Sequence, residues 1–346
     1  MLIGFRLDAN EEIATGHMMR CAAIALECQK QGAECIFLLA ENKCTDILQK
    51  RGLDYQIING HWKHWDDDIL LVQNVLEDLK IDLLVVDSYQ TTGKFLSAMN
   101  SIVPVLYMDD MCKEVYDVSI LVYYSQWQGD ETIAQKYASK DICLLAGMQY
   151  APLREEFAVE GQGRFEKEQI MITTGGTDPY HISYKVAELF LEENMLKAYS
   201  LLVILGQMNP DGEQLKKLAE SEKRLCVVQN VDNMGELMRS SKVAVSAGGN
   251  TLYELCATQT PTVCFTFSED QAEFAIEIGQ RKVMLYAGDA RENSDVVVKE
   301  IIEKIKAFAT NEELREECKK KMRQITDGRG AERIAKAIIK YGEAGL

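Results

Sequence analysis

Short apolar runs alternate with amphipathic segments along the first half of the chain. The expected strands are LIGFRLD (2–8), ECIFLLA (34–40), YQII (55–58), DLLVVD (82–87) and VPVLYMDD (103–110). The expected helices are 17–31, 44–51, 67–80 and 94–100. Strands that alternate with helices are typical of a parallel sheet with right-handed crossovers. The pattern therefore predicts a doubly wound α/β domain over residues 1–150.

A segment rich in Pro, Gly and charge (150–169) interrupts this rhythm, which then restarts. The later strands are expected at 170–176, 200–206, 225–230, 242–249, 261–267 and 282–288. They predict a second Rossmann-like domain over 151–346, whose last helix is a candidate to pack back on the first domain. A chain of 346 residues suits two domains. We therefore expect two parallel-sheet domains that face a cleft.

The negative net charge of the chain disfavours some classes of binding partner. The net charge is -16, and residues 1–150 hold 12 Lys and Arg against 22 Asp and Glu. Such a surface repels nucleic acid and anionic lipid, and no apolar run reaches the roughly 18 residues of a membrane span. We expect a cytoplasmic protein that binds neither nucleic acid nor membrane. The oligomeric state stays open, and a monomer is plausible.

Cysteine and histidine patterns argue against a metal or another cofactor. The ten cysteines never form C-x-x-C and mostly fall in apolar segments, so we interpret them as reduced and buried. The run GHWKHWDDD (60–68) contains no recognised ligand spacing. It predicts an exposed loop that leads into a helix capped by Asp66–Asp68.

Carboxylates follow several strands of the first half. Asp8, Asp87, Asp109 and Asp110 each end an apolar run. In open α/β sheets ligands bind outside the carboxyl ends of the strands, so these side chains are expected to line one edge. The alternative is that Asp simply forms turns there.

The histidine of ATGHMMRC stands where a strand turns into a helix. Gly16 allows the turn, and His17 falls in the first helical turn, whose positive end disfavours an imidazolium. A neutral imidazole there can accept a proton from water. Arg20 lies on the same side and is expected to pair with Asp8 or Asp87. The alternative for His17 is a packing or capping role.

Two glycine pairs in the second half end strands that lead into helices. Gly175–Gly176 and Gly248–Gly249 let backbone N–H groups approach a diphosphate, although tight packing is the alternative. Neither loop is a P-loop or a G-x-G-x-x-G motif, which disfavours NAD. Glu254 lies one turn into the helix that begins near Asn250. It can accept hydrogen bonds from two ribose hydroxyls or can simply complement the helix dipole.

Together these residues carry a resemblance. Arg6, Asp8, Ile13, Gly16–His17 and Met19–Cys21 resemble the N-terminal signature of the pseudaminic acid pathway hydrolases, which cleave UDP-2,4-diacetamido-2,4,6-trideoxy-β-L-altropyranose. The family extends to spore-coat polysaccharide biosynthesis proteins. The resemblance continues through Leu153–Arg154, TTGGTDP, SAGGNTLYELCA, Gln271 and DGRGAERI, and so covers nearly the whole chain.

The resemblance implies a GT-B fold, UDP-sugar hydrolysis without a metal, and roles for individual residues. His17 would be the general base that activates water, and UDP would leave by C–O cleavage with inversion. Gly248 and Gly249 would bind the diphosphate, and Glu254 would bind the ribose. The full set of candidate substrate-binding residues is Asp8, Gly16, Arg20, Asp87, Gly175, Gly176, Ser246, Gly248, Gly249, Asn250, Thr251, Glu254 and Gln271. The chain departs from the family at Ala14, where glycine is usual, and at Asp270, where asparagine is usual.

Three other functions share the same pattern. A GT-B glycosyltransferase with a UDP-sugar donor would share the second domain, although the acidic first half argues against docking on a lipid acceptor. A UDP-sugar epimerase would share the fold. A non-catalytic nucleotide-sugar binding protein would keep Glu254 and the glycines without needing His17.

Overall fold

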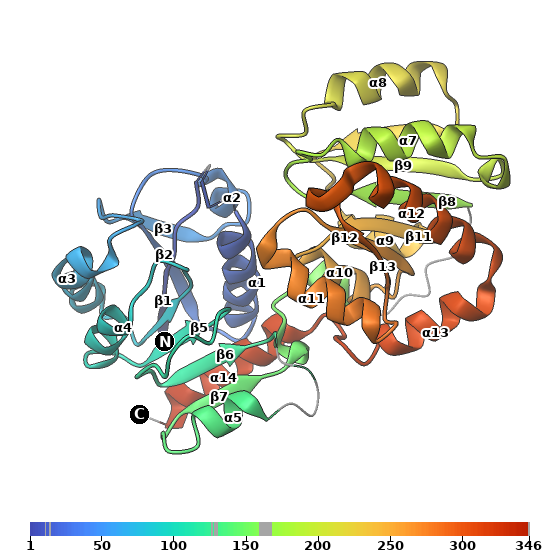
Figure 1. Ribbon diagram of the computed structural model, residues 1–346. Coiled ribbons are helices and arrows are strands. Elements are labelled where there is room, and N and C mark those ends of the chain that lie inside the picture. The colour runs from blue at the N-terminus through green and yellow to red at the C-terminus, as the bar shows by residue number, and fades with distance from the viewer. Residues whose placement is uncertain (11, 14, 126, 128–130, 159–167, 345–346) are drawn as a thin grey trace. The chain divides into compact units, whose positions relative to one another are not determined.

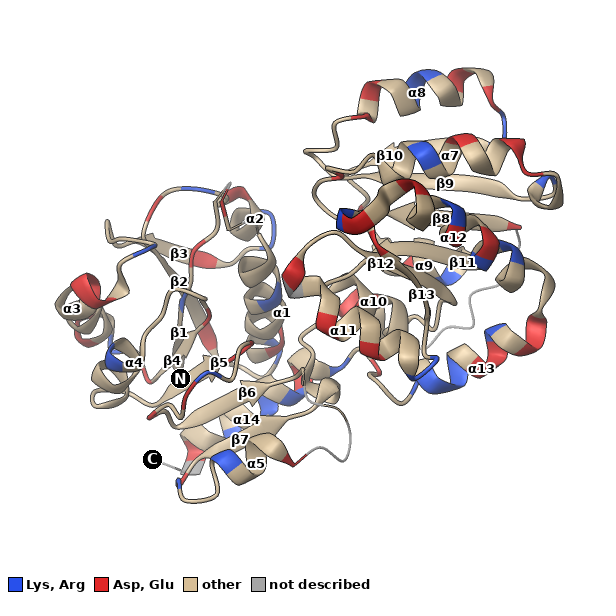
Figure 2. Ribbon diagram, in the orientation of Figure 1, with Lys and Arg blue, Asp and Glu red and all other residues tan. Residues whose placement is uncertain are grey.

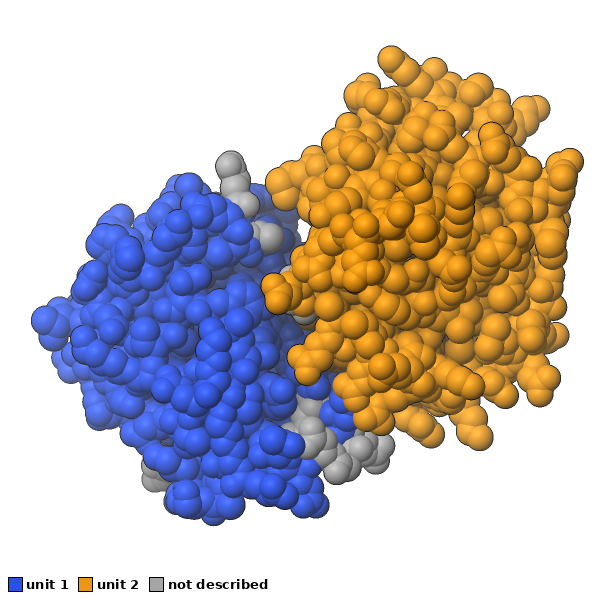
Figure 3. Space-filling view, viewed as in Figure 1, with its two compact units in different colours: residues 1–155, 329–346 blue, residues 156–328 orange. Residues whose placement is uncertain are grey.

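The computed structural model describes residues 1–10, 12–13, 15–125, 127, 131–158 and 168–344. Within these residues the chain divides into two compact units, and each contains one parallel sheet (Figures 1 and 3). Unit 1 comprises residues 1–155 and 329–346, and unit 2 comprises residues 156–328. The prediction of two doubly wound parallel-sheet domains is confirmed.

Unit 1 has a seven-stranded sheet of order β3-β2-β1-β4-β5-β6-β7, with every neighbouring pair parallel. Its strands are β1 (Leu2–Arg6), β2 (Glu34–Leu39), β3 (Asp54–Ile57), β4 (Leu83–Val86), β5 (Val105–Met108), β6 (Ile120–Tyr123) and β7 (Cys143–Ala146). The central strands β4 and β5 are buried along their whole length. This explains why they read as continuous apolar runs instead of alternating ones. The strands β6 and β7 lie beyond the five that the pattern predicted.

The helices of unit 1 lie between these strands in the chain, except the last two, which follow β7. They are α1 (Gly16–Lys30), α2 (Asp46–Gln49), η1 (Trp65–Asp68), α3 (Ile69–Leu79), α4 (Gly93–Asn100), α5 (Thr132–Lys136), η2 (Met148–Tyr150) and α14 (Gly330–Ala344). Helix α1 buries small side chains, among them Ala22 and Ala25, which allow close packing on the sheet. The chain's last helix, α14, belongs to this unit and packs against α1.

Unit 2 has a six-stranded sheet of order β10-β9-β8-β11-β12-β13, again parallel throughout. Its strands are β8 (Gln169–Thr173), β9 (Ser200–Leu205), β10 (Leu225–Gln229), β11 (Val243–Ala247), β12 (Thr262–Thr266) and β13 (Leu285–Asp289). Its helices are α7 (Ile182–Glu192), η3 (Asn194–Leu196), α8 (Gly212–Ser221), α9 (Met234–Ser240), α10 (Thr251–Ala257), α11 (Glu269–Gln280), α12 (Ala290–Thr310) and α13 (Glu312–Met322). The short helix α6 (Glu155–Ala158) contains the division between the units.

The core of unit 2 lies between its sheet and helices α7 and α12, where Ile172, Val186, Val245 and Ile301 are fully buried. Basic residues gather at the end of α13 in Lys319–Lys321, opposite acidic residues at its start (Figure 2). This arrangement complements the helix dipole. None of the described helices combines the length and apolarity that a membrane span requires.

Candidate active site

The loops after β1 and β4 meet at the point where the strand order of sheet 1 reverses. The chain proceeds from β1 toward β2 on one side, whereas β4 leads to β5 on the other. Connections that diverge in this way open a crevice at the carboxyl ends of the two strands, and ligands of open α/β sheets bind there. His17 follows β1, and Asp87 follows β4 directly. The topology therefore brings two predicted residues to the edge of sheet 1 where this rule places a ligand.

His17 and Asp87 form a buried pair. The imidazole Nδ1 lies 2.7 Å from Asp87 Oδ1, and the two residues are 7% and 1% exposed. Because an ionised carboxylate can only accept, this bond places a proton on Nδ1 and leaves the lone pair on Nε2. The ring of Tyr89 packs edge-on against the imidazole at 4.6 Å between ring centres. The pair has the geometry of a general base held by an orienting carboxylate.

Arg20 joins this pair to a second carboxylate. Its Nε donates to Asp87 Oδ2 at 2.6 Å, and its two terminal nitrogens donate to the oxygens of Asp110 at 2.9 and 2.7 Å. Nη2 also donates to Asp87 Oδ1, and Nη1 lies 2.5 Å from the hydroxyl of Tyr124. Of the two expected partners of Arg20, the structure selects Asp87.

The charges of this cluster stabilise one another. Burial opposes ionisation of Asp87, but the neighbouring Arg20 and His17 outweigh it and hold the pKa of Asp87 below its ordinary value. Burial likewise disfavours the charged guanidinium, yet Asp110 and Asp87 raise the pKa of Arg20 well above its usual value. Burial, together with the charge of Asp110, raises the pKa of Tyr89, so the phenol remains protonated. The cluster thus contains one fixed cation between two carboxylates.

Asp8 lies in a different cluster. Its carboxylate accepts from Arg6 Nη1 at 2.6 Å and from the Ala40 backbone N–H at 2.7 Å. Burial raises its pKa despite the Arg6 charge. Arg6 is fully buried and lies over the ring of Trp65, 4.2 Å from its centre. The alternative pairing of Arg20 with Asp8 is therefore wrong, because Arg6 takes this carboxylate.

One group of described residues has the composition of a metal site. Ligand atoms of His17, Asp87 and Asp110 lie within 4.8 Å of one another. However, the Arg20 guanidinium lies among the same atoms and bonds to both carboxylates. A cation bound there would be repelled by this charge and would have to displace its hydrogen bonds. The donor set therefore suits an internal ion-pair network better than a metal ion.

Both predicted glycine loops of unit 2 lie at the switch point of sheet 2. Gly175–Gly176 follow β8 and Gly248–Gly249 follow β11, and these two strands are adjacent at the reversal of strand order. Gly175 and Gly249 have φ of +80° and +109°, which L side chains rarely adopt. A Cβ on Gly248 would lie 2.8 Å from the Cβ of Gln271. The glycines thus satisfy backbone and packing constraints at the position where a ligand is expected.

The remaining predicted residues of unit 2 surround these loops. Glu254 lies in the first turn of α10 and is half-buried, as is Thr251, which begins the helix after Asn250. Ser246 is buried in β11, where its hydroxyl donates to the Ala247 carbonyl at 2.8 Å. Gln271 Oε1 accepts from the Phe267 backbone N–H at 3.2 Å. Ala14 and the side chain of Asp270, the two departures from the family, lie outside the described residues.

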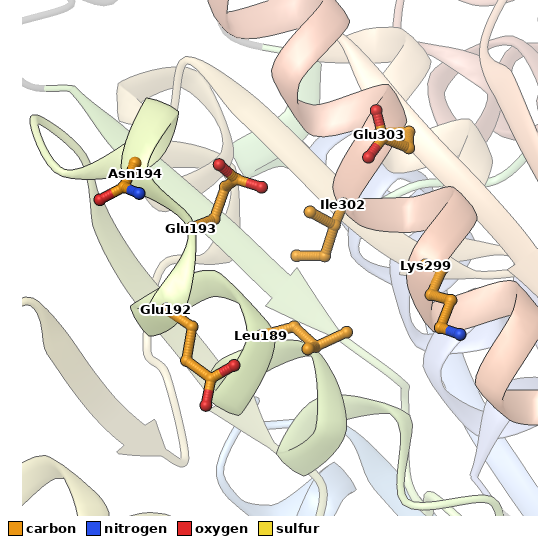
Figure 4. A pocket seen from close by; sticks show the side chains of 7 residues that line it. All are labelled: Leu189, Glu192, Glu193, Asn194, Lys299, Ile302 and Glu303. Carbon is orange, nitrogen blue, oxygen red and sulfur yellow. The ribbon is translucent and has the colours of Figure 1, made fainter.

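A pocket of about 330 Å³ lies elsewhere on unit 2. Figure 4 shows its lining side chains, which come from the end of α7, the following turn and α12: Leu189, Glu192, Glu193, Asn194, Lys299, Ile302 and Glu303. Helix α7 starts at the carboxyl end of β8 and runs back, so its last residues lie toward the opposite edge of the sheet. We therefore do not assign this pocket to the candidate site.

Sequence reasoning missed the roles of three residues. Asp110 was noted only as a strand-ending carboxylate, and neither Tyr89 nor Tyr124 was assigned a role. The signal for Asp110 was its position after the strand next to Asp87. The contact of Tyr124 with Arg20 depends on the placement of β6 beside β5, which the sequence alone does not give.

Known proteins resemble the chain over most of its length. Residues 170–337 match the glycosyltransferase family 28 C-terminal domain. The spore coat polysaccharide biosynthesis protein SpsG of Bacillus subtilis is 21% identical over 355 residues, which cover 96% of each chain. An uncharacterized protein of Methanocaldococcus jannaschii is 23% identical over 286 residues, 79% of this chain and 57% of its own.

A third relative combines two activities in its name. The pseudaminic acid cytidylyltransferase and UDP-2,4-diacetamido-2,4,6-trideoxy-β-L-altropyranose hydrolase of Helicobacter pylori is 22% identical over 258 residues, 74% of this chain. The match spans only 42% of the Helicobacter protein, and two of the three relatives are matched over less than two thirds of their length. The family resemblance drawn from the sequence is confirmed by these relatives.

Solved structures support the fold. MurG of Acinetobacter baumannii has a TM-score of 0.67 at 14% identity, with 98% of this chain and 100% of that chain covered. A putative UDP-N-acetylglucosamine 2-epimerase of Listeria monocytogenes has a TM-score of 0.66 at 12% identity, with 99% and 97% covered. The predicted GT-B fold class is confirmed. Together with the family match, the relatives indicate a nucleotide-sugar-related enzyme of sugar or polysaccharide biosynthesis.

Proposed function

We propose that the protein hydrolyses a UDP-linked diacetamido-trideoxy sugar and releases UDP and the free sugar. The observation that carries this proposal is the buried His17–Asp87 pair at the switch point of unit 1. An oriented base is needed to activate water but not merely to hold a nucleotide. The name of the Helicobacter relative supplies the substrate class, and that relative is matched only in part.

In this proposal His17 accepts a proton from water at Nε2. The oxygen of that water attacks the anomeric carbon while the bond from that carbon to the UDP oxygen breaks, so UDP departs with the bonding electrons and the configuration inverts. Asp87 stabilises the imidazolium that forms and keeps Nδ1 protonated throughout. No acid is required for the leaving group, because a diphosphate leaves as a stable anion.

Unit 2 supplies the nucleotide site in the same proposal. Backbone N–H groups of the two glycine loops bind the diphosphate, and Glu254 accepts hydrogen bonds from the ribose hydroxyls. The position of both loops at the switch point of sheet 2 supports this assignment. No bound metal is part of the scheme.

A GT-B glycosyltransferase that uses a UDP-sugar donor is the second candidate, favoured by the match to the glycosyltransferase family 28 domain. Incubation with UDP-2,4-diacetamido-trideoxy sugars in H₂¹⁸O without an acceptor separates the candidates. We expect free UDP, and ¹⁸O at the anomeric carbon of the released sugar. An intact but altered UDP-sugar would indicate an epimerase, and absence of turnover would refute hydrolysis.

Two variants test the separate roles proposed for the two units, turnover in unit 1 and UDP binding in unit 2. His17→Ala should abolish turnover and leave UDP affinity unchanged, with the exposed His64→Ala as the control that keeps both. Glu254→Ala should weaken UDP binding by about 1–3 kcal/mol, the value of charge-assisted hydrogen bonds. Its control is Glu213→Ala, which removes an exposed first-turn glutamate from α8. Titration calorimetry measures the UDP affinity of each variant. An unchanged affinity of Glu254→Ala would show that the nucleotide does not bind at Glu254.

A further inference from the structure

Arg20 has no donor left for a substrate. A guanidinium carries five N–H groups. The single N–H on Nε meets Asp87, the two on Nη1 meet Asp110 and Tyr124, and the two on Nη2 meet Asp87 and Asp110. Nη2 also lies 3.2 Å from His17 Nδ1, which cannot accept from it while Nδ1 carries its own proton. The side chain is only 6% exposed. A phosphate or sugar could be bound only by breaking one of these bonds, so the role of Arg20 lies inside the protein.

We propose that Asp110 and Arg20 are positioning residues that hold the His17–Asp87 pair ready to accept a proton. The inference rests on the proposed function, because it concerns how the base works. Both oxygens of Asp110 bind the two terminal nitrogens of Arg20, and Arg20 in turn binds both oxygens of Asp87. Asp87 then has one orientation, in which Oδ1 faces His17 Nδ1 at 2.7 Å.

Asp110 also determines the charge around the imidazole. Arg20 and the two carboxylates carry a net charge of -1 while the ring is neutral, and the total becomes zero when the ring gains a proton. Without the Asp110 charge, Arg20 and Asp87 would cancel and proton acceptance would leave a buried net cation. A ligand oxygen of Asp110 lies within 4.8 Å of a His17 ring nitrogen, a distance at which such a charge has a large effect inside a protein.

Apart from Asp109, the titratable groups next to the cluster add no charge. They are the thiol of Cys21, which donates to Asp87 Oδ2 at 3.3 Å, and the phenols of Tyr89, Tyr107 and Tyr124. Burial raises the pKa of the Cys21 thiol and of the Tyr89 and Tyr107 phenols, so these groups stay protonated near neutral pH. The neighbouring Asp109 accepts from the backbone N–H groups of Met111 and Cys112 and so stabilises its own loop.

The proposal can be tested by measuring the protonation of the His17 imidazole directly. In protein with ¹⁵N-labelled histidine, long-range ¹H–¹⁵N spectra report which ring nitrogen of His17 carries the proton and the pH at which both do. We expect the wild type to hold its proton on Nδ1. In Asp110→Asn, which keeps the shape but removes the charge, the second proton should bind at a pH lower by about one to two units. Tyr124→Phe removes a bond to Arg20 without a change in charge and should leave this pH unchanged.

Kinetics of the same variants separate positioning from binding. Asp110→Asn should lower kcat about 10- to 100-fold with KM nearly unchanged, and Asp110→Glu, which restores the charge, should recover part of the loss. Arg20→Lys keeps the charge but cannot bridge both carboxylates, so a second, Nε2-protonated form of His17 should appear.

The two hypotheses fail separately. If the wild type releases no free sugar, the proposed function is wrong, while the spectra still test the positioning of His17. If folded Asp110→Asn protonates His17 at the wild-type pH, the inference is overturned. If Asp110→Asn does not fold, an unchanged Nδ1 proton in Arg20→Lys overturns it instead. Thermal unfolding identifies the folded variants.

Discussion

Replacing Asp87 by asparagine is the most stringent test of the role of the buried His17–Asp87 pair. The substitution keeps the size of the side chain, but it converts an acceptor of four hydrogen bonds into a group with one acceptor oxygen and an NH₂. The NH₂ must then face a donor, either an N–H of Arg20 or the Nδ1–H of His17. The imidazole can resolve this conflict by moving its proton to Nε2, which removes the lone pair from the reacting side.

The expected loss of stability follows from the burial of the pair. Removing one partner of a buried ion pair costs about 3–5 kcal/mol when the other charge is left uncompensated. Asp110 still compensates Arg20 in this variant, so we expect the lower end, about 3 kcal/mol. For a unit of this size that corresponds to a fall in Tm of roughly 6–12 °C. Turnover should fall by about 10⁴-fold, as expected when a base is held in the wrong tautomer.

The pH dependence of stability gives an independent check. Arg20 and His17 hold the pKa of Asp87 below its ordinary value, against the effect of burial. The wild type therefore gains stability from this carboxylate above about pH 4 and loses it as the pH falls further. The Asp87→Asn variant lacks the carboxylate. The difference between the free energies of unfolding of the wild type and the variant should therefore become smaller below pH 4.

Urea unfolding at pH 7, 5 and 3.5, with UDP release at pH 7, measures these effects. UDP affinity should not change, because the candidate nucleotide site lies in unit 2. Near-wild-type turnover would refute the assignment of Asp87 as the orienting group. A stability difference that stays constant down to pH 3.5 would show that its charge contributes nothing to folding.

Two further substitutions test the local structure. Gly249→Ala places a side chain at φ of +109° and should lower the free energy of unfolding, measured in urea, by roughly 1–3 kcal/mol. The control Gly212→Ala lies at a helix start with ordinary space around it and should raise the free energy of unfolding by up to about 1 kcal/mol. Equal effects of the two substitutions would contradict the backbone argument. Trp65→Ala uncovers the buried Arg6 guanidinium and should cost about 3–5 kcal/mol, and a cost below about 1 kcal/mol by the same measurement would show that the ring is not a core residue.

Some elements could be predicted only in part. The five strands expected in the first half exist, because buried parallel strands are continuous apolar runs. The strands β6 and β7 were not among the five expected, although they are as long as β3, β4 and β5, so length alone does not explain the difference. Similarly, Trp65 and Asp68 were assigned to an exposed loop and a cap, whereas both are buried beside Arg6. Their burial depends on a strand nearly sixty residues away.

The sequence by itself determined two parallel-sheet domains and the strand-to-helix turns that carry His17 and the glycine pairs, because apolar periodicity and glycine positions are local properties of the chain. Only the tertiary structure decided which charges meet. Arg20 could have paired with Asp8 or Asp87, and the strand order placed β4 and β5 so that Asp87 and Asp110 enclose its guanidinium. Hydrogen bonds between side chains up to 104 residues apart depend on this order, which no local pattern records.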